Sequence, residues 1–302
     1  MEKLEISLKT YQLRREMSDL ALEMGYYPYT PELFEDMDEF SSLPREVQKS
    51  QLATVIAGQQ FQFLRPDITT MVIKSILPTI SENSCAKLFY QSAIYRVQNN
   101  AVKEIPQFGI ECLGHIDEIC ELEVLGLANR YLQKTPVMFE IGTSKFVDGI
   151  IRQSTLEKSA EKIFKKLIAI KNKAEVIKFA ELHQLPTEVM DILPHLFDLR
   201  GTYDELWALV TGTSYETVVH QHLKEIQHIK TLNIPGMIDL SLTSPLTYYD
   251  GIIFKAYVAG MSQPVLSGGR YKGDTGTQAI GFSIDVESYM RVHSKEASAW
   301  QV

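Results

Sequence analysis

The chain has 302 residues, of which 45% are hydrophobic and 23% are charged, and its formal net charge is −8. This composition is typical of a globular protein with one large domain or two smaller ones. Because affinity for nucleic acid depends mainly on cationic contacts to phosphates, the acidic balance weakens the case for nucleic-acid binding without excluding it. The sequence has no apolar run of the ~18 residues needed to span a bilayer. Its first residues do not resemble a signal peptide, so we expect a cytoplasmic protein.

Three cysteines, Cys85, Cys112 and Cys120, are spread along the chain without any CxxC spacing. An odd, sparse set of this kind argues against a disulfide framework and against a zinc site. We therefore expect buried free thiols.

His220 and His222 lie two residues apart in a predicted helix, where they would face different sides, so no metal site is predicted there either.

The N-terminal part of the chain is predicted to contain one long helix followed by strands. Residues 4–24 carry apolar side chains at helical spacing, and Gly25 follows as a stop signal. Residues 26–31 are predicted to be extended, because residues before proline avoid the helical region. Residues 61–114 favour strands, interrupted by one helix near residues 69–78.

The rest of the chain alternates between helical and strand patterns. Asp117 is placed to cap a helix that runs to about Leu132. Residues 155–230 are rich in Lys, Glu, Ala and Leu at helical spacing and predict an all-helical insertion. Strand patterns return after Pro235, with a hairpin turn at residues 259–263; the predicted strands are 237–242, 248–258, 264–267 and 279–283.

Asp67 follows a predicted strand in the segment Leu64-Arg65-Pro66-Asp67. It could form a surface ion pair with Arg65. It could instead accept hydrogen bonds from the ammonium group of a ligand, a charge-assisted contact worth ~1.5–3 kcal/mol. The segment by itself leaves both interpretations open.

Arg96 lies inside an apolar strand, where an unpaired charge is costly. Its guanidinium therefore needs an anion. This anion could be an internal partner such as Glu111 or Asp67, or it could be the carboxylate or phosphate of a ligand.

Gln107 and Glu111 are predicted to share one face of a strand over residues 106–114, because side chains alternate along a strand. The amide and the carboxylate are then about 13 Å apart along the strand at ~3.3 Å per residue. Gly109 lies between them and leaves space for a ligand or for a close backbone.

Two glycine-containing segments near the C-terminus are weak signals when each is taken alone. Tyr248-Tyr249-Asp250-Gly251 fits a hairpin strand, and residues 268–273 fit a flexible loop. This loop lacks the GK[ST] ending of a P-loop, so it does not by itself indicate phosphate binding.

In combination, these segments resemble the class II aminoacyl-tRNA synthetases, and among them histidyl-tRNA synthetase. The resemblance covers most of residues 10–295, with the helical insertion matched least well. The matching segments are Pro31 for motif 1, Tyr95-Arg96 for motif 2, Ala279-Ile280-Gly281-Phe282-Ser283 for motif 3, Leu246, Tyr248-Tyr249, Gly251 and Phe254 for the first histidine signature, and Gly268-Gly269-Arg270-Tyr271 for the second.

The resemblance implies an α+β fold in which an antiparallel sheet, flanked by helices, carries a helical insertion. The synthetase-like core would comprise residues 1–152 and 236–302. The helical insertion would comprise residues 153–235.

The resemblance also implies a histidine-binding pocket, with no metal and no other cofactor. A zwitterion with an imidazole needs anions, a cation and hydrogen-bonding aromatic side chains, and the matching segments offer all three. The resemblance implies that Asp67 and Thr69 contact the amino group of histidine and that Arg96 lies near its carboxylate. Gln107 and Tyr249 would lie close to the ligand backbone, and Glu111 and Tyr248 would contact the imidazole. The second signature adds Arg270 and Tyr271 to the implied histidine-binding residues.

Departures from the synthetase pattern affect the cations that handle ATP. Ser244 stands where the first signature has an arginine, and Ser288 stands where motif 3 supplies an arginine for the phosphates. Gln98 replaces a glutamate shortly after Arg96. Losing one preorganised donor can lower a rate by ~10²–10³, and two cations are missing, so we expect no catalytic residues.

A relative of histidyl-tRNA synthetase without these cations resembles the regulatory subunits of ATP phosphoribosyltransferase. Because the sequence ends at Val302, it is expected to lack an anticodon-binding domain. The resemblance implies an allosteric subunit that activates a short catalytic subunit in the first step of histidine biosynthesis and transmits inhibition by L-histidine. It also implies a homodimer within a larger hetero-oligomer, without tRNA or membrane partners.

Two other functions stay open at this point. The chain could be an enzyme that still activates histidine, which ATP–pyrophosphate exchange would reveal, although Ser244 and Ser288 argue against it. It could instead be a synthetase-like scaffold or a sensor of another amino acid, which a tight response to that amino acid would reveal.

Overall fold

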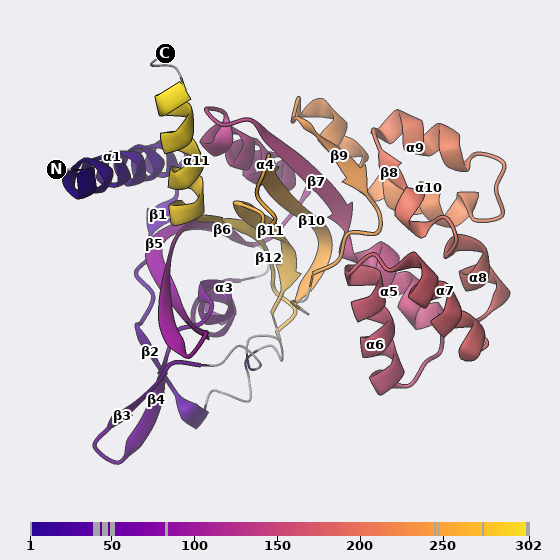
Figure 1. Ribbon diagram of the computed structural model, residues 1–302, viewed down its shortest axis with the longest axis horizontal. Helices are drawn as coiled ribbons and strands as arrows, with labels where there is room; N and C mark the ends of the chain where they lie inside the picture. Colours follow the sequence, from indigo (N-terminus) through magenta and orange to yellow (C-terminus); the bar gives the residue numbers. More distant parts are fainter. Residues whose placement is uncertain are drawn as a thin grey trace. The chain divides into compact units, whose positions relative to one another are not determined.

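The computed structural model describes residues 2–38, 43, 48, 52–81, 84–244, 246, 248–273 and 275–299 (Figure 1). The chain divides into two compact units. The first unit comprises Met1–Val137, Leu246–Tyr248 and Val258–Val302, and the second comprises Met138–Pro245 and Tyr249–Tyr257.

A long hairpin forms the centre of the first unit. Strand β5 (Cys85–Gln98) pairs antiparallel with strand β6 (Ala101–Gly114) along its whole length. The turn between them consists of Asn99 and Asn100, with φ values of 51° and 61°. Two successive residues with positive φ are the mark of a type I′ turn, whose twist matches that of the flanking strands, and asparagine tolerates this conformation. The hairpin confirms the strand pattern predicted for residues 61–114.

Three further strands extend this sheet, giving the order β1-β5-β6-β12-β11 within the first unit. Strand β1 (Tyr27–Pro28) is parallel to β5, whereas β12 (Gln278–Asp285) and β11 (Leu266–Lys272) are antiparallel to their neighbours. Residues 268–272, which fit a flexible loop when taken alone, therefore lie in a strand. The reason is tertiary, because all seven residues of β11 are paired with β12.

Three helices cover one face of these strands: α1 (Glu2–Glu23), α4 (Glu118–Leu132) and α11 (Val286–Ala299). They meet at Tyr131 of α4, whose hydroxyl donates to the Met17 carbonyl of α1 at 3.0 Å and whose carbonyl accepts from the Tyr289 hydroxyl of α11 at 3.2 Å. The Tyr131 ring packs on Phe108 of β6, with 5.0 Å between ring centroids. Helix α4 begins where it was predicted, because Asp117 caps it by accepting from the backbone N–H of Cys120 at 2.9 Å.

The opposite face of β6 carries Glu111, because side chains alternate along a strand. Helix α3 (Ile68–Met71) approaches this face and continues as a π-helical turn at Val72–Ile76 and a 3₁₀ turn at Leu77–Thr79. The helix predicted near residues 69–78 is thus present, although its hydrogen bonding changes along its length. A separate three-stranded sheet is formed by β2 (Phe34–Asp36), β4 (Gln60–Leu64) and β3 (Thr54–Ala57), in that order.

The second unit contains four strands in the order β10-β7-β9-β8: β10 (Tyr249–Val258), β7 (Val137–Thr143), β9 (Gly236–Asp239) and β8 (Arg200–Gly201). The prediction that residues 155–230 are all helical was wrong at β8, which pairs antiparallel with β9. The strand predicted over 237–242 ends earlier, at Asp239. Its carboxylate accepts from the Ser241 backbone N–H at 2.9 Å and from its hydroxyl at 2.6 Å, which turns the chain.

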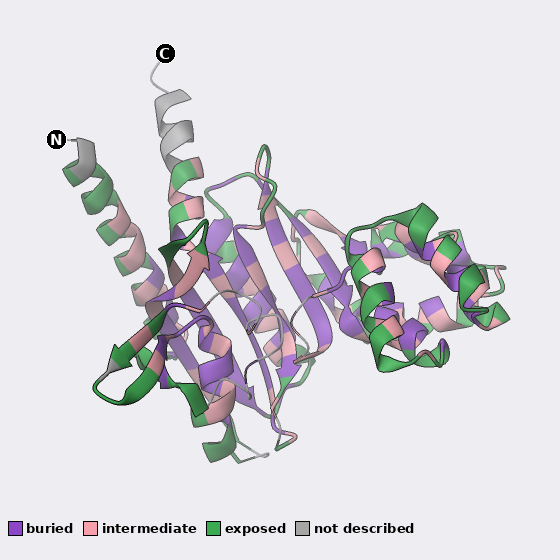
Figure 2. Cartoon of the chain, turned by 60° about the horizontal axis from the view of Figure 1, so that its bottom comes forward, coloured by how far each residue is buried: buried purple, intermediate pink, exposed green. Residues whose placement is uncertain are grey.

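Outside β8, the regular structure of residues 155–230 is helical, as predicted, and helix α5 (Ser144–Gln153) precedes this region. A capping box between Thr202 and Glu205 starts α9, and Asn172 caps α7. Figure 2 shows buried residues on the inner sides of these helices and exposed residues on their outer sides. In the described part of the chain, no helix is long and apolar enough to cross a membrane. The helices are α5 (Ser144–Gln153), α6 (Lys158–Ala169), α7 (Lys173–Leu182), α8 (Thr187–Ile192), α9 (Tyr203–Val210) and α10 (Glu216–Glu225), with 3₁₀ turns at Leu196–Asp198 and Gln227–Thr231.

We predict that Gly281→Ala lowers the free energy of unfolding by ~1–3 kcal/mol. A Cβ atom at this position of β12 would overlap the Glu111 carboxylate and the Ile110 carbonyl. Gly149→Ala in helix α5 is the control, because the nearest atom to its added Cβ is His222 Nε2 at 4.0 Å. It should stabilise the protein by up to ~1 kcal/mol through helix propensity. Urea unfolding followed by circular dichroism measures both, and an unchanged midpoint for Gly281→Ala would contradict the prediction.

Candidate functional site

The Glu111 carboxyl is the centre of a polar cluster on the face of β6 that helix α3 approaches. Its side chain is only 1% exposed. The Thr69 hydroxyl donates to its Oε1 and the Tyr271 hydroxyl to its Oε2, each at 3.0 Å. Burial raises the pKa of Glu111 to about 8, although the hydrogen bonds from Tyr271 and Thr69 lower this pKa. At neutral pH the carboxyl therefore keeps its proton most of the time and can act as a hydrogen-bond donor as well as an acceptor.

Two glycines, Gly281 and Gly109, make room for side chains in the sheet around Glu111. Gly281 of β12 lies directly opposite Glu111 in the strand register, and the absence of a Cβ there leaves room for the carboxyl. Gly109 was expected to leave space for a ligand or a close backbone. The Tyr90 ring occupies this space, because a Cβ on Gly109 would overlap the ring. Gly109 therefore accommodates an internal side chain of the cross-strand neighbour.

Asp67 starts helix α3 and lies beside Glu111. Its Oδ1 accepts from the backbone N–H of Thr70 at 2.7 Å and from the Thr70 hydroxyl at 2.6 Å. Its Oδ2 forms no hydrogen bond with any residue in the described ranges, so half of the carboxylate can still accept from a ligand. Its negative charge also raises the pKa of Glu111.

Arg65 does not form the ion pair with Asp67 that the sequence left open. Its guanidinium is buried and, among the residues that the structure describes, donates only to carbonyls: Ala93 at 2.6 Å, Pro31 at 2.8 Å and Glu32 at 2.9 Å. These bonds tie the Pro31 segment to strand β5. Sequence reasoning missed this role, and the apolar neighbours of Arg65 were the only available sign of its burial.

Arg96 is half-buried on β5, and its Nε and Nη2 both lie 3.4 Å from the Pro66 carbonyl oxygen. Across the part of the chain that the structure describes, Arg96 has no carboxylate partner. The proposed internal ion pairs with Glu111 and Asp67 are therefore not formed. A guanidinium held by long bonds to one carbonyl can bind a carboxylate or phosphate.

Tyr248 joins the Glu111 cluster through Tyr271. The two rings are T-shaped, with centroids 5.7 Å apart, and the Lys272 backbone N–H donates to the Tyr248 carbonyl at 3.2 Å. Gln107 lies on the same face of β6 as Glu111, four residues away, and is partly exposed. Tyr249 belongs to the second unit, where its carbonyl accepts from the Ser144 hydroxyl at 3.3 Å.

Arg270 is directed away from this cluster. It precedes Tyr271 in β11, so the two side chains point to opposite faces of the sheet. Its guanidinium donates to Glu121 Oε1 of helix α4 at 2.9 Å and to Gln278 Oε1 at 2.5 Å. The second signature therefore brings Tyr271, and not Arg270, to Glu111.

Ser288, at the position of the expected motif 3 arginine, has a local structural role. Its backbone N–H and its hydroxyl donate to the two carboxylate oxygens of Asp285, each at 2.9 Å. This arrangement fixes the first turn of helix α11. A hydroxyl engaged in this way supplies no positive charge to a phosphate.

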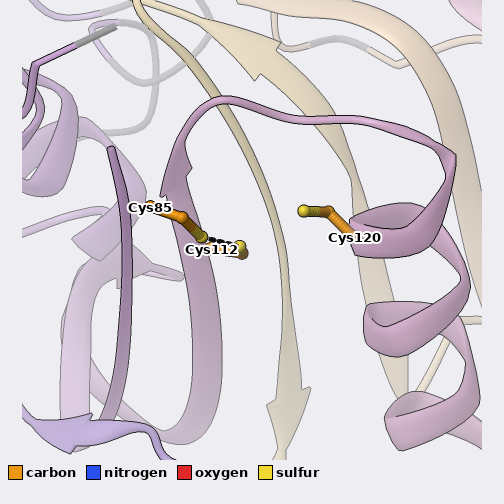
Figure 3. A group of neighbouring side chains, drawn as sticks. All are labelled: Cys85, Cys112 and Cys120. Carbon is orange, nitrogen blue, oxygen red and sulfur yellow. Dashed lines mark hydrogen bonds between the residues drawn. The ribbon is translucent and has the colours of Figure 1, made fainter. Parts of the chain in front are cut away.

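The three cysteines form a second cluster, which their spacing did not predict. Their Sγ atoms all lie within 4.8 Å of one another (Figure 3). All three are free, but only Cys112 is buried, whereas Cys85 is exposed and Cys120 is intermediate. The expectation of buried thiols is therefore confirmed for Cys112 only. It was wrong for Cys85, which is the first residue of β5 at the end of the sheet, and Cys120 is only partly buried.

Comparisons with known proteins agree with this fold. The histidyl-tRNA synthetase family profile matches residues 5–289. An ATP phosphoribosyltransferase regulatory subunit from Oceanobacillus iheyensis is 25% identical over 298 residues, covering 94% of this chain and 74% of its own. Another, from Streptococcus gordonii, is 25% identical over 301 residues and covers 94% of this chain and 90% of its own.

Solved structures show the same mixed α+β architecture. An ATP phosphoribosyltransferase regulatory subunit/histidyl-tRNA synthetase from Bacillus halodurans has a TM-score of 0.78 at 21% identity, covering 97% of this chain and 80% of that chain. The ATP phosphoribosyl transferase (HisG:HisZ) complex from Thermotoga maritima gives a TM-score of 0.69 at 21% identity, covering 91% and 96%. Histidyl-tRNA synthetase from Nostoc gives 0.75 at 15% identity, covering 97% and 73%. Because the family profile extends over almost the whole chain, this protein belongs to the histidyl-tRNA synthetase family, and the relatives quoted above that match it along most of its length are regulatory subunits of ATP phosphoribosyltransferase.

Proposed function

We propose that this chain is the non-catalytic regulatory subunit of ATP phosphoribosyltransferase, the enzyme of the first step of histidine biosynthesis. It binds a short catalytic subunit in the cytoplasm, makes that subunit active and subjects it to inhibition by L-histidine. Relatives with this function match 94% of the chain. One structural contrast carries the proposal. The Glu111 carboxyl is hydrogen-bonded by Thr69 and Tyr271, as a binding group for histidine would be. Ser288, at the position where ATP chemistry would need a cation, instead belongs to the cap of a helix.

The cluster has the groups that a histidine zwitterion requires. Asp67 offers one carboxylate oxygen to the ammonium group, and Arg96 offers its guanidinium to the carboxylate. Glu111, held by Thr69 and Tyr271, faces the imidazole. Gln107 and Tyr248 complete the proposed contacts, and Arg270 acts indirectly by holding β11 to Glu121.

The protonation of Glu111 suits an imidazole ligand. Free histidine has a side-chain pKa of ~6.5, and the pKa of Glu111 is raised to about 8. Between pH ~6.5 and pH ~8, the Glu111 carboxyl is protonated and the imidazole of free histidine is neutral. The carboxyl and the imidazole can therefore share a single proton in a charge-assisted hydrogen bond. No net proton exchange with solvent is then needed.

Inhibition requires that histidine binds one state of the complex more tightly than the other. A coupling free energy of ~1–3 kcal/mol gives a ~5–150-fold effect, which is sufficient for feedback. The proposed assembly is a homodimer of this chain within a larger hetero-oligomer, without tRNA.

The first prediction from this function concerns assembly and feedback. A short catalytic subunit from the same organism should be inactive alone, become active when this chain is added, and lose activity again as histidine is titrated. Steady-state formation of phosphoribosyl-ATP measures all three steps. If the chain changes neither the activity nor the response to histidine, the assignment of the partner is wrong.

The second prediction concerns the pocket. Arg96→Ala and Glu111→Gln should raise the histidine concentration for half-inhibition by ~10–100-fold, as expected for the loss of a charged hydrogen bond worth ~1.5–3 kcal/mol. Activation of the catalytic subunit should persist. Arg130→Ala, an exposed arginine on the helix-covered side, is the matched control and should leave inhibition unchanged. Normal inhibition in both pocket variants would refute the assignment of the pocket.

The third prediction concerns pH. Above pH ~8, free Glu111 is ionised and the complex must take up a proton, so affinity for histidine should fall by up to ~10-fold per pH unit. Below pH ~6.5, free histidine is already protonated and one proton must be released, so affinity should fall again. Isothermal titration calorimetry measures this profile. Glu111→Gln should remove the decline between pH 8 and 9, and a flat wild-type profile would contradict the shared proton.

A further inference from the structure

The three cysteines come from three different elements that meet at one end of the first unit's sheet. Cys85 is the first residue of β5, Cys112 lies near the end of β6, and Cys120 lies in the first turn of α4. The Sγ atoms of Cys85 and Cys112 are 3.1 Å apart, and Cys120 points toward them from the helix (Figure 3). They are the only cysteines in the chain.

Strand register and the helix cap bring these thiols together. Cys85 pairs with Gly114, and Lys87 pairs with Cys112, so Cys85 and Cys112 are diagonal neighbours on the same face of the hairpin. The chain then turns after Gly114, and Asp117 fixes the start of α4, which places Cys120 over this face. The Cys120 thiol lies 3.7 Å from the His115 carbonyl oxygen, within the connecting turn.

The distances between the sulfur atoms suit a thiophilic metal ion. A Zn–S bond is ~2.3 Å long, so two thiolates of a tetrahedral zinc site lie ~3.8 Å apart. The pairs observed here range from 3.1 Å to at most 4.8 Å, on either side of that value.

The surroundings also suit a bound metal thiolate. One Zn²⁺ with three thiolates carries a net charge of −1. Lys87, directly opposite Cys112 in the register, places an ammonium group on the same face, where it pairs with Glu123 of α4 at 2.6 Å. The exposure of Cys85 gives an ion a route from solvent, and Cys112 anchors the site in the core.

We propose that Cys85, Cys112 and Cys120 bind one Zn²⁺ ion, with a water molecule as the fourth ligand. Each thiol loses its proton on binding, so up to three protons pass to the buffer for every ion bound. The ion ties the start of β5, the end of β6 and the first turn of α4 to one another. This site lies on the helix-covered face and is separate from the Glu111 cluster, which lies on the opposite face.

The experiment uses the full chain, purified under reducing conditions, with Co²⁺ as the probe and Zn²⁺ as the competitor. One equivalent of Co²⁺ should produce thiolate-to-cobalt charge-transfer absorption and the intense visible bands of a tetrahedral site, and Zn²⁺ should abolish both. Zn²⁺ should also protect all three thiols from titration with a thiol reagent.

Cys85→Ser and Cys120→Ser should each weaken metal binding at least ~10-fold and reduce the charge-transfer absorption. The side chains of Cys85 and Cys120 are not fully buried, so both variants are expected to fold even if Cys112→Ser does not fold. Ser84→Ala, next to Cys85, is the matched control and should bind as the wild type does. The proposal is overturned if one equivalent of Co²⁺ gives no thiolate band, if both cysteine variants bind normally, or if the thiols only form a Cys85–Cys112 disulfide that Zn²⁺ does not prevent.

Discussion

The burial of the Glu111 carboxyl inside a β-sheet is the constraint on which the site depends. A carboxyl that is 1% exposed must be hydrogen-bonded, and Thr69 and Tyr271 supply one bond to each oxygen. The strand opposite must lack a side chain at this point, which Gly281 provides. Burial then raises the pKa of Glu111 to about 8 and gives it the dual donor and acceptor character that an imidazole can use. One packing solution therefore links the fold, the protonation state and the proposed ligand.

The two faces of the first unit's sheet separate the packing against helices from the polar cluster around Glu111. On the covered face, Phe108, Tyr131 and Arg270 join β6, α4 and β11 through ring packing and an ion pair. On the other face, Glu111 and Tyr271 form the polar cluster. Because neighbouring residues of a strand point in opposite directions, adjacent positions of one signature serve different purposes. The same alternation separates the cysteine cluster from the Glu111 cluster, although both use β6.

Serine at positions 244 and 288, in place of the arginines of the synthetase pattern, fits the proposed regulatory subunit. In the proposed function, Asp67, Arg96 and Glu111 bind histidine without ATP, whereas the transfer of an adenylyl group needs positive charge on the phosphates. Ser288 has instead become part of the cap of helix α11. Binding that is uncoupled from chemistry can still shift an equilibrium between two states of a complex, and this is what feedback inhibition requires. Histidine recognition and catalytic silence are thus compatible within one fold.

Local patterns in the sequence were sufficient to predict the elements with strong local signals. These include helix α1 before Gly25, the Asp117 cap of α4 and the strands of the β5–β6 hairpin, because helix periodicity, caps and β-alternation depend on near neighbours. The motif residues also pointed to Glu111 and Arg96 as site candidates. The tertiary structure alone decided that Arg65 is buried against three carbonyls, that residues 268–272 form a strand, that Arg270 pairs with Glu121, and that three distant thiols meet. The physical reason is that strand pairing and helix docking between segments distant in sequence determine which face a side chain occupies and which partner it meets.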